Sequence, residues 1–365
     1  MITHSERLNK VRRVFDPYND RKGYVRLDRN EDPIGYGDAF FNNWKSQITI
    51  DDIAAYADST AFTQELSKWV GVLPENVYIG AGSDALIKAI FETYIDQGDT
   101  ILLQNPSWRM YNVYASIYGA EINWINYSDD FFFDTDALIQ TLQAKNIRMV
   151  ILANPNQPTG TSISYEILKK IISAAKERNT LVVVDEAYYL FHDVTVVDLI
   201  SDFDNLIIAR TFSKAFGLAG LRIGYAVAHS RRIQDFMLLR PVTDANSLAI
   251  NFASYLLGNI DYVIDRIKDF NRGRDFLFEK MRENNLVCQK SYGNFLLLAC
   301  IDEEKARSLI AYAREKKYLL KGPFLEPPLK NYIRISTSSL ELMKSFWDDC
   351  CYAMKNFAKK YGLEK

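Results

Sequence analysis

The chain has 365 residues, of which 48% are hydrophobic and 13% aromatic, and its formal net charge is −2. This length suits two domains or one large α/β domain with an appendage, and the lack of a basic excess excludes nucleic-acid and membrane-surface roles. Four cysteines and three histidines show no paired metal-ligand spacing, so we expect reduced thiols and no metal site.

Residues 1–45 include Pro17, Pro33 and several glycines, and we expect an irregular segment that packs on a smaller domain or on a partner subunit. The N-terminus lacks the apolar core of a signal peptide. No apolar run approaches the roughly 18 residues that a membrane span needs. These observations predict a cytoplasmic protein.

From about residue 75, short apolar strands alternate with amphipathic helices. The predicted strands are 77–80, 100–104, 122–125, 149–153, 181–185, 206–209 and 222–228. The predicted helices are 83–94, 110–118, 135–145 and 165–178. Strands rich in valine and isoleucine with helices between them indicate a mostly parallel sheet covered on both faces. We therefore predict an α/β fold whose three-layer large domain spans residues 46–245.

The pattern changes near residue 245. A long helix is predicted over 260–284, and strands near 293–300 and 332–336 alternate with helices at 303–316 and 340–360. This arrangement predicts a smaller α+β domain over residues 246–365.

Two loops at the ends of predicted strands carry groups that could bind a ligand. Residues 78–86 read as strand, glycine turn and helix start, which suits a phosphate, although Ser83 or Asp84 as an ordinary N-cap explains the pattern equally well. Residues 154–160 contain two prolines, a glycine and amide side chains that can donate to a phenolate oxygen, with a structural turn as the alternative.

A carboxylate and an amine follow in the same order along the chain. Asp185 ends the buried strand 181–185, where it could keep a pyridine nitrogen protonated or serve as a cap or ion-pair partner. Lys214 has Ser213 before it and Arg222 shortly after it. An amine can form a Schiff base with an aldehyde while a hydroxyl and a guanidinium neutralise a phosphate. A solitary lysine would be a surface residue, but the joint occurrence of these segments predicts a pyridoxal 5′-phosphate (PLP) enzyme.

These motifs resemble those of PLP-dependent enzymes with the aspartate aminotransferase fold (fold type I). The chain looks most like the histidinol-phosphate aminotransferase branch, which also contains threonine-phosphate decarboxylase. The resemblance extends from Pro17, Tyr18 and Arg21 through residues 27–33 to residues 332–336. It implies an aminotransferase that moves an amino group between glutamate and a small phosphorylated compound. It also implies a homodimer with shared active sites.

The resemblance further implies a role for each matching residue. Lys214 would hold the cofactor and shuttle protons, Asp185 would pair with the pyridine nitrogen, Tyr188 would bond the ring hydroxyl, and Trp108 would stack on the ring. The cofactor phosphate would be bound by Ser83, Asp84, Ser213, Arg222 and, across the dimer interface, Tyr56. Arg334 would bind the substrate carboxylate and Tyr18 would line a substrate-phosphate pocket.

Two positions depart from the family's pattern. Gln157 stands where asparagine is usual, so either Gln157 or Asn156 would donate to the ring oxygen. Trp108 stands where tyrosine is commoner, which leaves the substrate open. Arg12, Arg13 and Arg21 could meet a second anionic group or could be ordinary surface charges.

Three alternatives to this function follow from the same fold. A decarboxylase of a phosphorylated amino acid would use the same cofactor site, because only the substrate's orientation selects the bond that breaks. A PLP-sensing transcription regulator would need a DNA-binding segment ahead of the match, and we expect none. Sugar aminotransferases of this fold generally show other motifs around the lysine.

Overall fold

The computed structural model describes residues 8–9, 11 and 21–362. Its large sheet has seven strands in the order β2 (Val77–Gly80), β8 (Gly224–Ala228), β7 (Leu206–Thr211), β6 (Leu181–Asp185), β5 (Met149–Ala153), β3 (Thr100–Asn105) and β4 (Glu121–Asn126). Only β8 runs against its two neighbours, and the remaining pairs are parallel. The predicted mostly parallel α/β sheet is confirmed.

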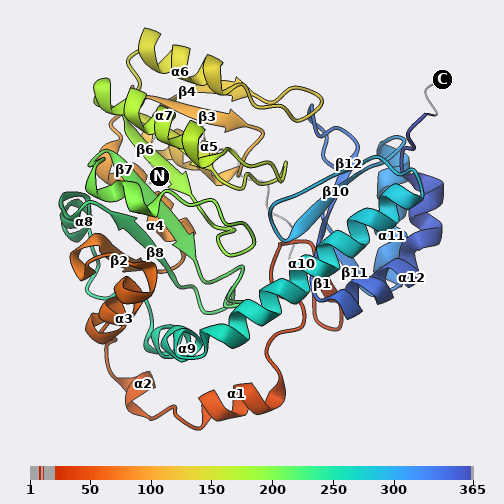
Figure 1. Cartoon of the computed structure of the whole chain (residues 1–365), viewed down its shortest axis with the longest axis horizontal. Coiled ribbons are helices and arrows are strands. Elements are labelled where there is room, and N and C mark those ends of the chain that lie inside the picture. The colour runs from red at the N-terminus through yellow and green to blue at the C-terminus, as the bar shows by residue number, and fades with distance from the viewer. Residues whose placement is uncertain (1–7, 10, 12–20, 363–365) are drawn as a thin grey trace, which may run out of the picture.

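Helices cover both faces of this sheet (Figure 1). Successive residues of a strand point to opposite faces, so Val182 and Val184 pack in one core while Leu181 and Val183 pack in the other. The first core includes α6 (Thr135–Ala144) and α7 (Tyr165–Glu177), and the second includes α4 (Ser83–Tyr94), α5 (Met110–Tyr118) and α8 (Ser230–Met237). This gives the three layers that the sequence predicts.

Two small sheets lie on the other side of the molecule. One has the antiparallel order β12 (Tyr332–Ser336), β10 (Phe295–Ala299), β9 (Cys288–Gln289), and the other pairs β1 (Val25–Leu27) with β11 (Tyr318–Leu320). Helices α11 (Glu303–Glu315) and α12 (Leu340–Phe357) pack against the three-stranded sheet in a core of their own. The expected α+β part is therefore present.

Helix α10 (Ile260–Glu283) connects the two halves (Figure 1). Its residues Val263 and Ile267 pack in the core of the large sheet, whereas Leu277 and Met281 pack in the core of the small sheet. The division at residues 245 and 246 remains a prediction. Among the described residues, no helix combines the length and apolar composition that a membrane crossing needs.

The expectation that residues 1–45 are irregular is wrong for β1 and for α1 (Asp38–Lys45). Both elements are short and depend on distant partners that local sequence does not report. β1 pairs with β11, and Trp44 of α1 stacks on Phe252 with ring centroids 4.1 Å apart. Further elements that the sequence did not predict are α2 (Asp51–Ala54), α3 (Thr60–Val70), η2 (Pro74–Asn76), η3 (Val197–Ser201), α8, α9 (Ser247–Leu257), β9 and β11.

Candidate active site

Asp185 lies at the carboxyl end of β6 with only 6% of its surface exposed. The Tyr111 hydroxyl donates to its Oδ2 at 2.6 Å, and the Ala187 N–H donates to its Oδ1 at 3.0 Å. Burial raises the pKa of Asp185 to about 6, and these two hydrogen bonds oppose the rise. Each oxygen retains a lone pair, so the carboxylate can accept a further bond from a cationic N–H group.

Trp108 stands beside this carboxylate, just before α5. Its ring packs edge-to-face on Tyr111, with centroids 5.2 Å apart and planes at 82°. The Trp108 side chain is only half-buried, so part of its surface remains available to a ligand. Because Tyr111 holds both Trp108 and Asp185, the indole and the carboxylate belong to one site.

Lys214 follows β7, and its Nζ donates to the carbonyl oxygen of Arg29 at 2.9 Å. Burial lowers the pKa of Lys214 to about 8, and Arg334 lowers it as well, while Glu31 acts in the opposite direction. Near neutral pH a fraction of these amines is therefore uncharged. An uncharged amine in a polar pocket is a nucleophile and a proton acceptor.

The N-terminus of α4 forms an anion cradle with Arg222. Gly82 precedes the helix at φ 86°, and no side chain caps its first turn, so the amides of Ser83 and its successors are free to bind an anion. A Cβ at Gly82 would lie 2.8 Å from Nη2 of Arg222. Arg222 also donates to Ser213 Oγ at 3.4 Å and has a left-handed φ of 56°. Such backbone strain in a non-glycine residue is typical of functional sites.

Arg334 lies near the lysine, whose pKa its charge lowers, and Tyr188 lies near Arg334. Arg334 lies on β12, and its side chain is 6% exposed. Its Nη2 donates a hydrogen bond to the Asp28 carbonyl at 2.8 Å. Its buried Nε has no partner within the described chain. Phe295 contacts both, 5.4 Å from the Tyr188 ring and 5.6 Å from the Arg334 guanidinium. Burial raises the pKa of Tyr188 to about 12, against the nearby charge of Arg334. An unpartnered guanidinium nitrogen in a buried site favours an anionic ligand.

The loop at residues 154–160 shows which amide is free. The Asn156 side chain is fully buried; its Oδ1 accepts from Ser107, and its Nδ2 donates to the Pro106 carbonyl at 2.9 Å and to Thr159 Oγ1 at 2.8 Å. Both Nδ2 hydrogens are therefore used, one within the loop and one on the segment that contains Pro106. Gln157 is half-buried, and its amide has no hydrogen-bond partner among the described residues.

A buried ion pair connects the ends of two strands of the large sheet. Glu186 Oε2 lies 2.8 Å from Nη2 of Arg210, and both side chains are at most 2% exposed. The Arg210 guanidinium also lies 3.5 Å from the centroid of the Tyr189 ring and donates to Thr195 Oγ1 at 2.7 Å. Because Glu186 follows Asp185 directly, this pair ties the end of β6 to β7.

The comparisons with known proteins agree with this geometry. The model of the family "Aminotransferase class I and II" matches residues 44–347. This chain belongs to the class I and II aminotransferases. It is 33% identical to the histidinol-phosphate aminotransferase of Thermoanaerobacter pseudethanolicus over 87% of this chain and 89% of that one.

Solved structures share the fold of this aminotransferase. The histidinol-phosphate aminotransferase of Sinorhizobium meliloti in complex with pyridoxal-5′-phosphate aligns with a TM-score of 0.85 and 24% identity, over 97% of this chain and 98% of that one. The L-threonine-O-3-phosphate decarboxylase of Porphyromonas gingivalis aligns with a TM-score of 0.76 and 23% identity, over 89% and 98%. The predicted fold type I class, histidinol-phosphate aminotransferase-like branch and PLP dependence are confirmed.

The residues of this aminotransferase fit PLP on chemical grounds. The anion cradle at Gly82 and Arg222 suits a phosphate, and the buried Lys214 amine suits an aldehyde. Asp185 offers a buried carboxylate to a pyridine nitrogen, and half-buried Trp108 offers an aromatic face.

Two of the predicted site residues are not placed with the others. Tyr56 follows α2 and is 85% exposed at the surface. Tyr18 lies outside the described residues, as do Arg12 and Arg13. Arg21 lies within them, but it is neutralised by carboxylates, with Asp28 at 2.5 Å and Glu31 at 2.8 Å.

Sequence reasoning missed several side chains that the fold brings to the site. They are Asn30, Tyr111, Glu186 and Arg210, and the backbone of Lys321 pairs with that of Arg334. Tyr111 could have been found, since it stands three positions after Trp108, the spacing that places two residues on one side of a helical turn. No local pattern marks the others, because their partners lie on other elements.

Proposed function

We propose that this aminotransferase exchanges an amino group between glutamate and a small phosphorylated compound, with histidinol phosphate as the first candidate. The relatives' names suggest that compound. The observation that carries the proposal is the buried Arg334 guanidinium, whose Nε has no partner within the described chain. Lys321 stands directly opposite Arg334 in an antiparallel bridge, with backbone N···O distances of 2.7 and 3.1 Å.

The two side chains share one face of the strand pair, because directly opposite residues in antiparallel strands point the same way. Ile333 and Ile335 pack in the core of the small sheet, so the face of β12 that bears Arg334 points away from that core. A guanidinium and an ammonium together suit a carboxylate on one substrate and a phosphate on the other.

The proposed chemistry assigns one task to each group of the chain. When bound, PLP supplies the aldehyde that takes up the amino group and the ring that withdraws electrons. Lys214 Nζ would hold the cofactor and move a proton, Asp185 would keep the pyridine nitrogen protonated, and Trp108 would stack on the ring. Ser83, Asp84, Ser213 and Arg222 would hold the cofactor phosphate.

Tyr188 and Gln157 would donate to the ring oxygen of PLP. Both amide hydrogens of Asn156 are engaged with Pro106 and Thr159, which favours Gln157 of the two candidates. The extra methylene of glutamine relative to asparagine would let its amide extend from the loop while Asn156 braces it.

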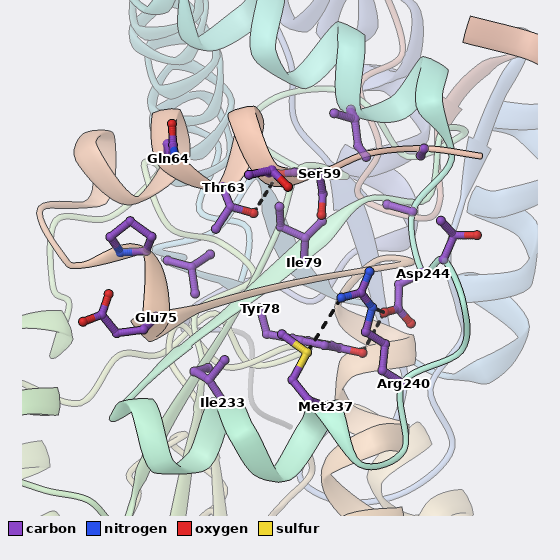
Figure 2. Close-up of a pocket in the computed structure, with 17 residues that line it drawn as sticks. Ser59, Thr63, Gln64, Glu75, Tyr78, Ile79, Ile233, Met237, Arg240 and Asp244 are labelled. Carbon is purple, nitrogen blue, oxygen red and sulfur yellow. Dashed lines mark hydrogen bonds and ion pairs between the residues drawn. The ribbon is translucent and has the colours of Figure 1, made fainter. Parts of the chain in front are cut away.

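We also propose a homodimer in which Tyr56 reaches the partner's cofactor phosphate. Two cavities of about 290 and 440 Å³ share residues 57, 243 and 245, and the larger one is lined by Tyr56. Figure 2 shows the smaller one, where Arg240 lies between Met237 and Asp244. The same region exposes large apolar side chains, namely Ile50, Ile53, Tyr56, Leu238 and Val242.

This surface is connected to the proposed phosphate cradle. Ser247 Oγ donates to the Ala55 carbonyl at 3.4 Å, and Asn246 donates to the carbonyl of Leu221, which directly precedes Arg222, at 3.0 Å. A second copy that covers the exposed apolar side chains would therefore come close to the cradle. Val242→Asp should yield monomers in sedimentation velocity and weaken PLP binding, whereas a wild-type monomer would refute this part. Cytoplasmic location remains a prediction from the sequence.

A panel of amino compounds tests the substrate. The purified, PLP-loaded enzyme is incubated with 2-oxoglutarate and either histidinol phosphate, histidinol or an aromatic amino acid, and glutamate formation is measured. The proposal expects kcat/KM to be highest for the phosphorylated compound and to fall on Lys321→Met. Equal rates with and without the phosphate would contradict it. Release of carbon dioxide from a phosphorylated amino acid without glutamate would favour the decarboxylase.

A further inference from the structure

Residues 28–30 contact three groups of the active site at once. The Asp28 carbonyl accepts a hydrogen bond from Arg334 at 2.8 Å, and the Arg29 carbonyl accepts one from Lys214 at 2.9 Å. The third, Asn30, donates from Nδ2 to the Tyr188 hydroxyl oxygen at 2.8 Å. This segment precedes the large domain in sequence, yet it lies between β12 and the carboxyl end of β6.

The Asn30 amide is fixed in one orientation. Asn30 is 1% exposed, with a left-handed φ of 55°. Its backbone N–H donates to Ser336 Oγ at 2.8 Å, and the Ser336 hydroxyl donates to Asn30 Oδ1 at 2.8 Å. The single Ser336 hydrogen goes to Oδ1, so Oδ1 faces Ser336, whereas a reversed amide would deprive that hydrogen of this acceptor. Nδ2 must then face Tyr188.

This orientation determines the direction of the Tyr188 hydroxyl. An amide nitrogen can only donate, so the Tyr188 oxygen accepts from Asn30 and its own hydrogen must point elsewhere. Within the described part of the chain no acceptor receives that hydrogen. We propose that Asn30 is a positioning residue that turns the Tyr188 hydroxyl hydrogen toward the ring oxygen of PLP.

The surroundings of Tyr188 make this direction matter. The charges that act on its hydroxyl come from Arg334 on β12 and Asp185 on β6, and Phe295 packs against its ring. A donated hydrogen bond polarises the Tyr188 O–H group and strengthens it as a donor. An acceptor at position 30 would instead compete for the same hydrogen. The inference rests on the proposed role of Tyr188, so its test must separate the two.

The test is a pH titration of the visible absorbance of the PLP-loaded enzyme. A hydrogen bond to the ring oxygen stabilises its ionised form and lowers the pKa of the bound cofactor. Asn30→Gly suits the left-handed backbone and removes only the amide. We expect it to raise that pKa by roughly 0.5 to 1. Tyr188→Phe should raise it by at least as much, and Asn30→Gly should add nothing further in the Tyr188→Phe background.

A matched control is Asn294→Ala, because the Asn294 amide donates to the backbone carbonyl of Asn30, at 3.2 Å, and not to the Tyr188 hydroxyl. It should lower thermal stability but leave the absorbance titration unchanged. Equal shifts for Asn30→Gly and Asn294→Ala would show general loosening and overturn the inference. An additive effect of Asn30→Gly on Tyr188→Phe would overturn it as well.

Asn30→Asp serves if the glycine variant does not bind the cofactor. Aspartate has nearly the size of asparagine and adopts the left-handed backbone conformation, but its carboxylate would accept the Tyr188 hydrogen. We expect Asn30→Asp to raise the pKa of the bound cofactor. The part of this rise that persists in the Tyr188→Phe background measures the effect of the added charge alone. No difference between the two backgrounds would refute the role of Asn30. If Tyr188→Phe itself leaves the titration unchanged, the proposed role of Tyr188 fails instead.

Discussion

Two walls of the active site are built in different ways. The cofactor edge consists of the residues that follow β2, β3, β5, β6 and β7, and its key side chains stand in short motifs at strand ends. The outer wall consists of residues 28–30, 321 and 334–336. It is assembled from segments far apart, with contacts that span 158 residues from Asn30 to Tyr188 and 306 from Asn30 to Ser336.

This difference explains what each wall can do. Parallel strands place their carboxyl ends at one edge, so motifs separated by helices meet there without special contacts. Residues 28–30 of the outer wall meet the edge through hydrogen bonds with Lys214 and Tyr188. A ligand that binds Arg334 therefore acts on the same short segment that contacts the lysine.

The largest expected effect is at Lys214, where both walls meet. Lys214→Ala removes the amine that would hold the cofactor and move the proton, so turnover should fall by roughly 10³-fold or more. The visible absorbance of lysine-bound PLP should disappear as well. Circular dichroism should show an intact fold, because the variant removes a buried amine whose pKa is lowered by burial. Turnover near the wild-type rate would refute the assignment.

The second prediction concerns the buried ion pair of Glu186 and Arg210, which supports the cofactor edge. Glu186→Gln leaves the Arg210 guanidinium buried without its counter-charge, which should cost about 3–5 kcal/mol of unfolding free energy. Urea denaturation measures the loss. The exposed pair Glu303 and Arg307 is the control, since Glu303→Gln should cost less than about 1 kcal/mol. Equal losses would mean that Arg210 is not held in a dry environment.

The sequence predicted the cofactor edge far better than the outer wall. The strand bounds at 77–80, 149–153 and 181–185 are those of the structure, because buried β-branched runs and glycine turns are local signals. β1 and the role of Asn30 could not be predicted, since a three-residue strand and a single polar side chain acquire their function from distant partners. Tyr111 lies between these cases, being local in sequence but identified only by its bond to Asp185.

The third prediction concerns the pH dependence contributed by Asp185 in the cofactor-free protein. Its pKa is raised from 3.8 to about 6, so the folded state binds this proton more tightly than the unfolded state. The stabilising contribution is present below about pH 4 and lost as pH rises through 6. Above that pH the buried charge costs about 2–3 kcal/mol, a penalty absent in Asp185→Asn. Urea midpoints should therefore favour the variant more at pH 7.5 than at pH 4.5.

A control of opposite sign is available at the surface. The pKa of Asp52 is lowered by hydrogen bonds from Thr49, so its contribution to stability is present at neutral pH and lost in acid. Asp52→Asn should therefore lose stability relative to wild type as pH rises. If the stability of Asp185→Asn relative to wild type falls as pH rises, as expected for Asp52→Asn, then burial does not destabilise the Asp185 carboxylate.

The smallest expected effects distinguish Gln157 from Asn156 within one loop. Asn156→Ala removes the bonds to Ser107, Pro106 and Thr159, so it should lower the unfolding free energy by about 1–3 kcal/mol. Gln157→Ala should change stability by less than about 0.5 kcal/mol. It should instead raise the pKa of the bound cofactor, read from its visible absorbance, by up to about 1, because one hydrogen-bond donor to the ring oxygen is lost. If the two variants exchange these effects, Asn156 is the donor. The bonds of the Asn156 side chain would then have to rearrange when PLP binds, and the cofactor edge would be less preformed than its local motifs imply.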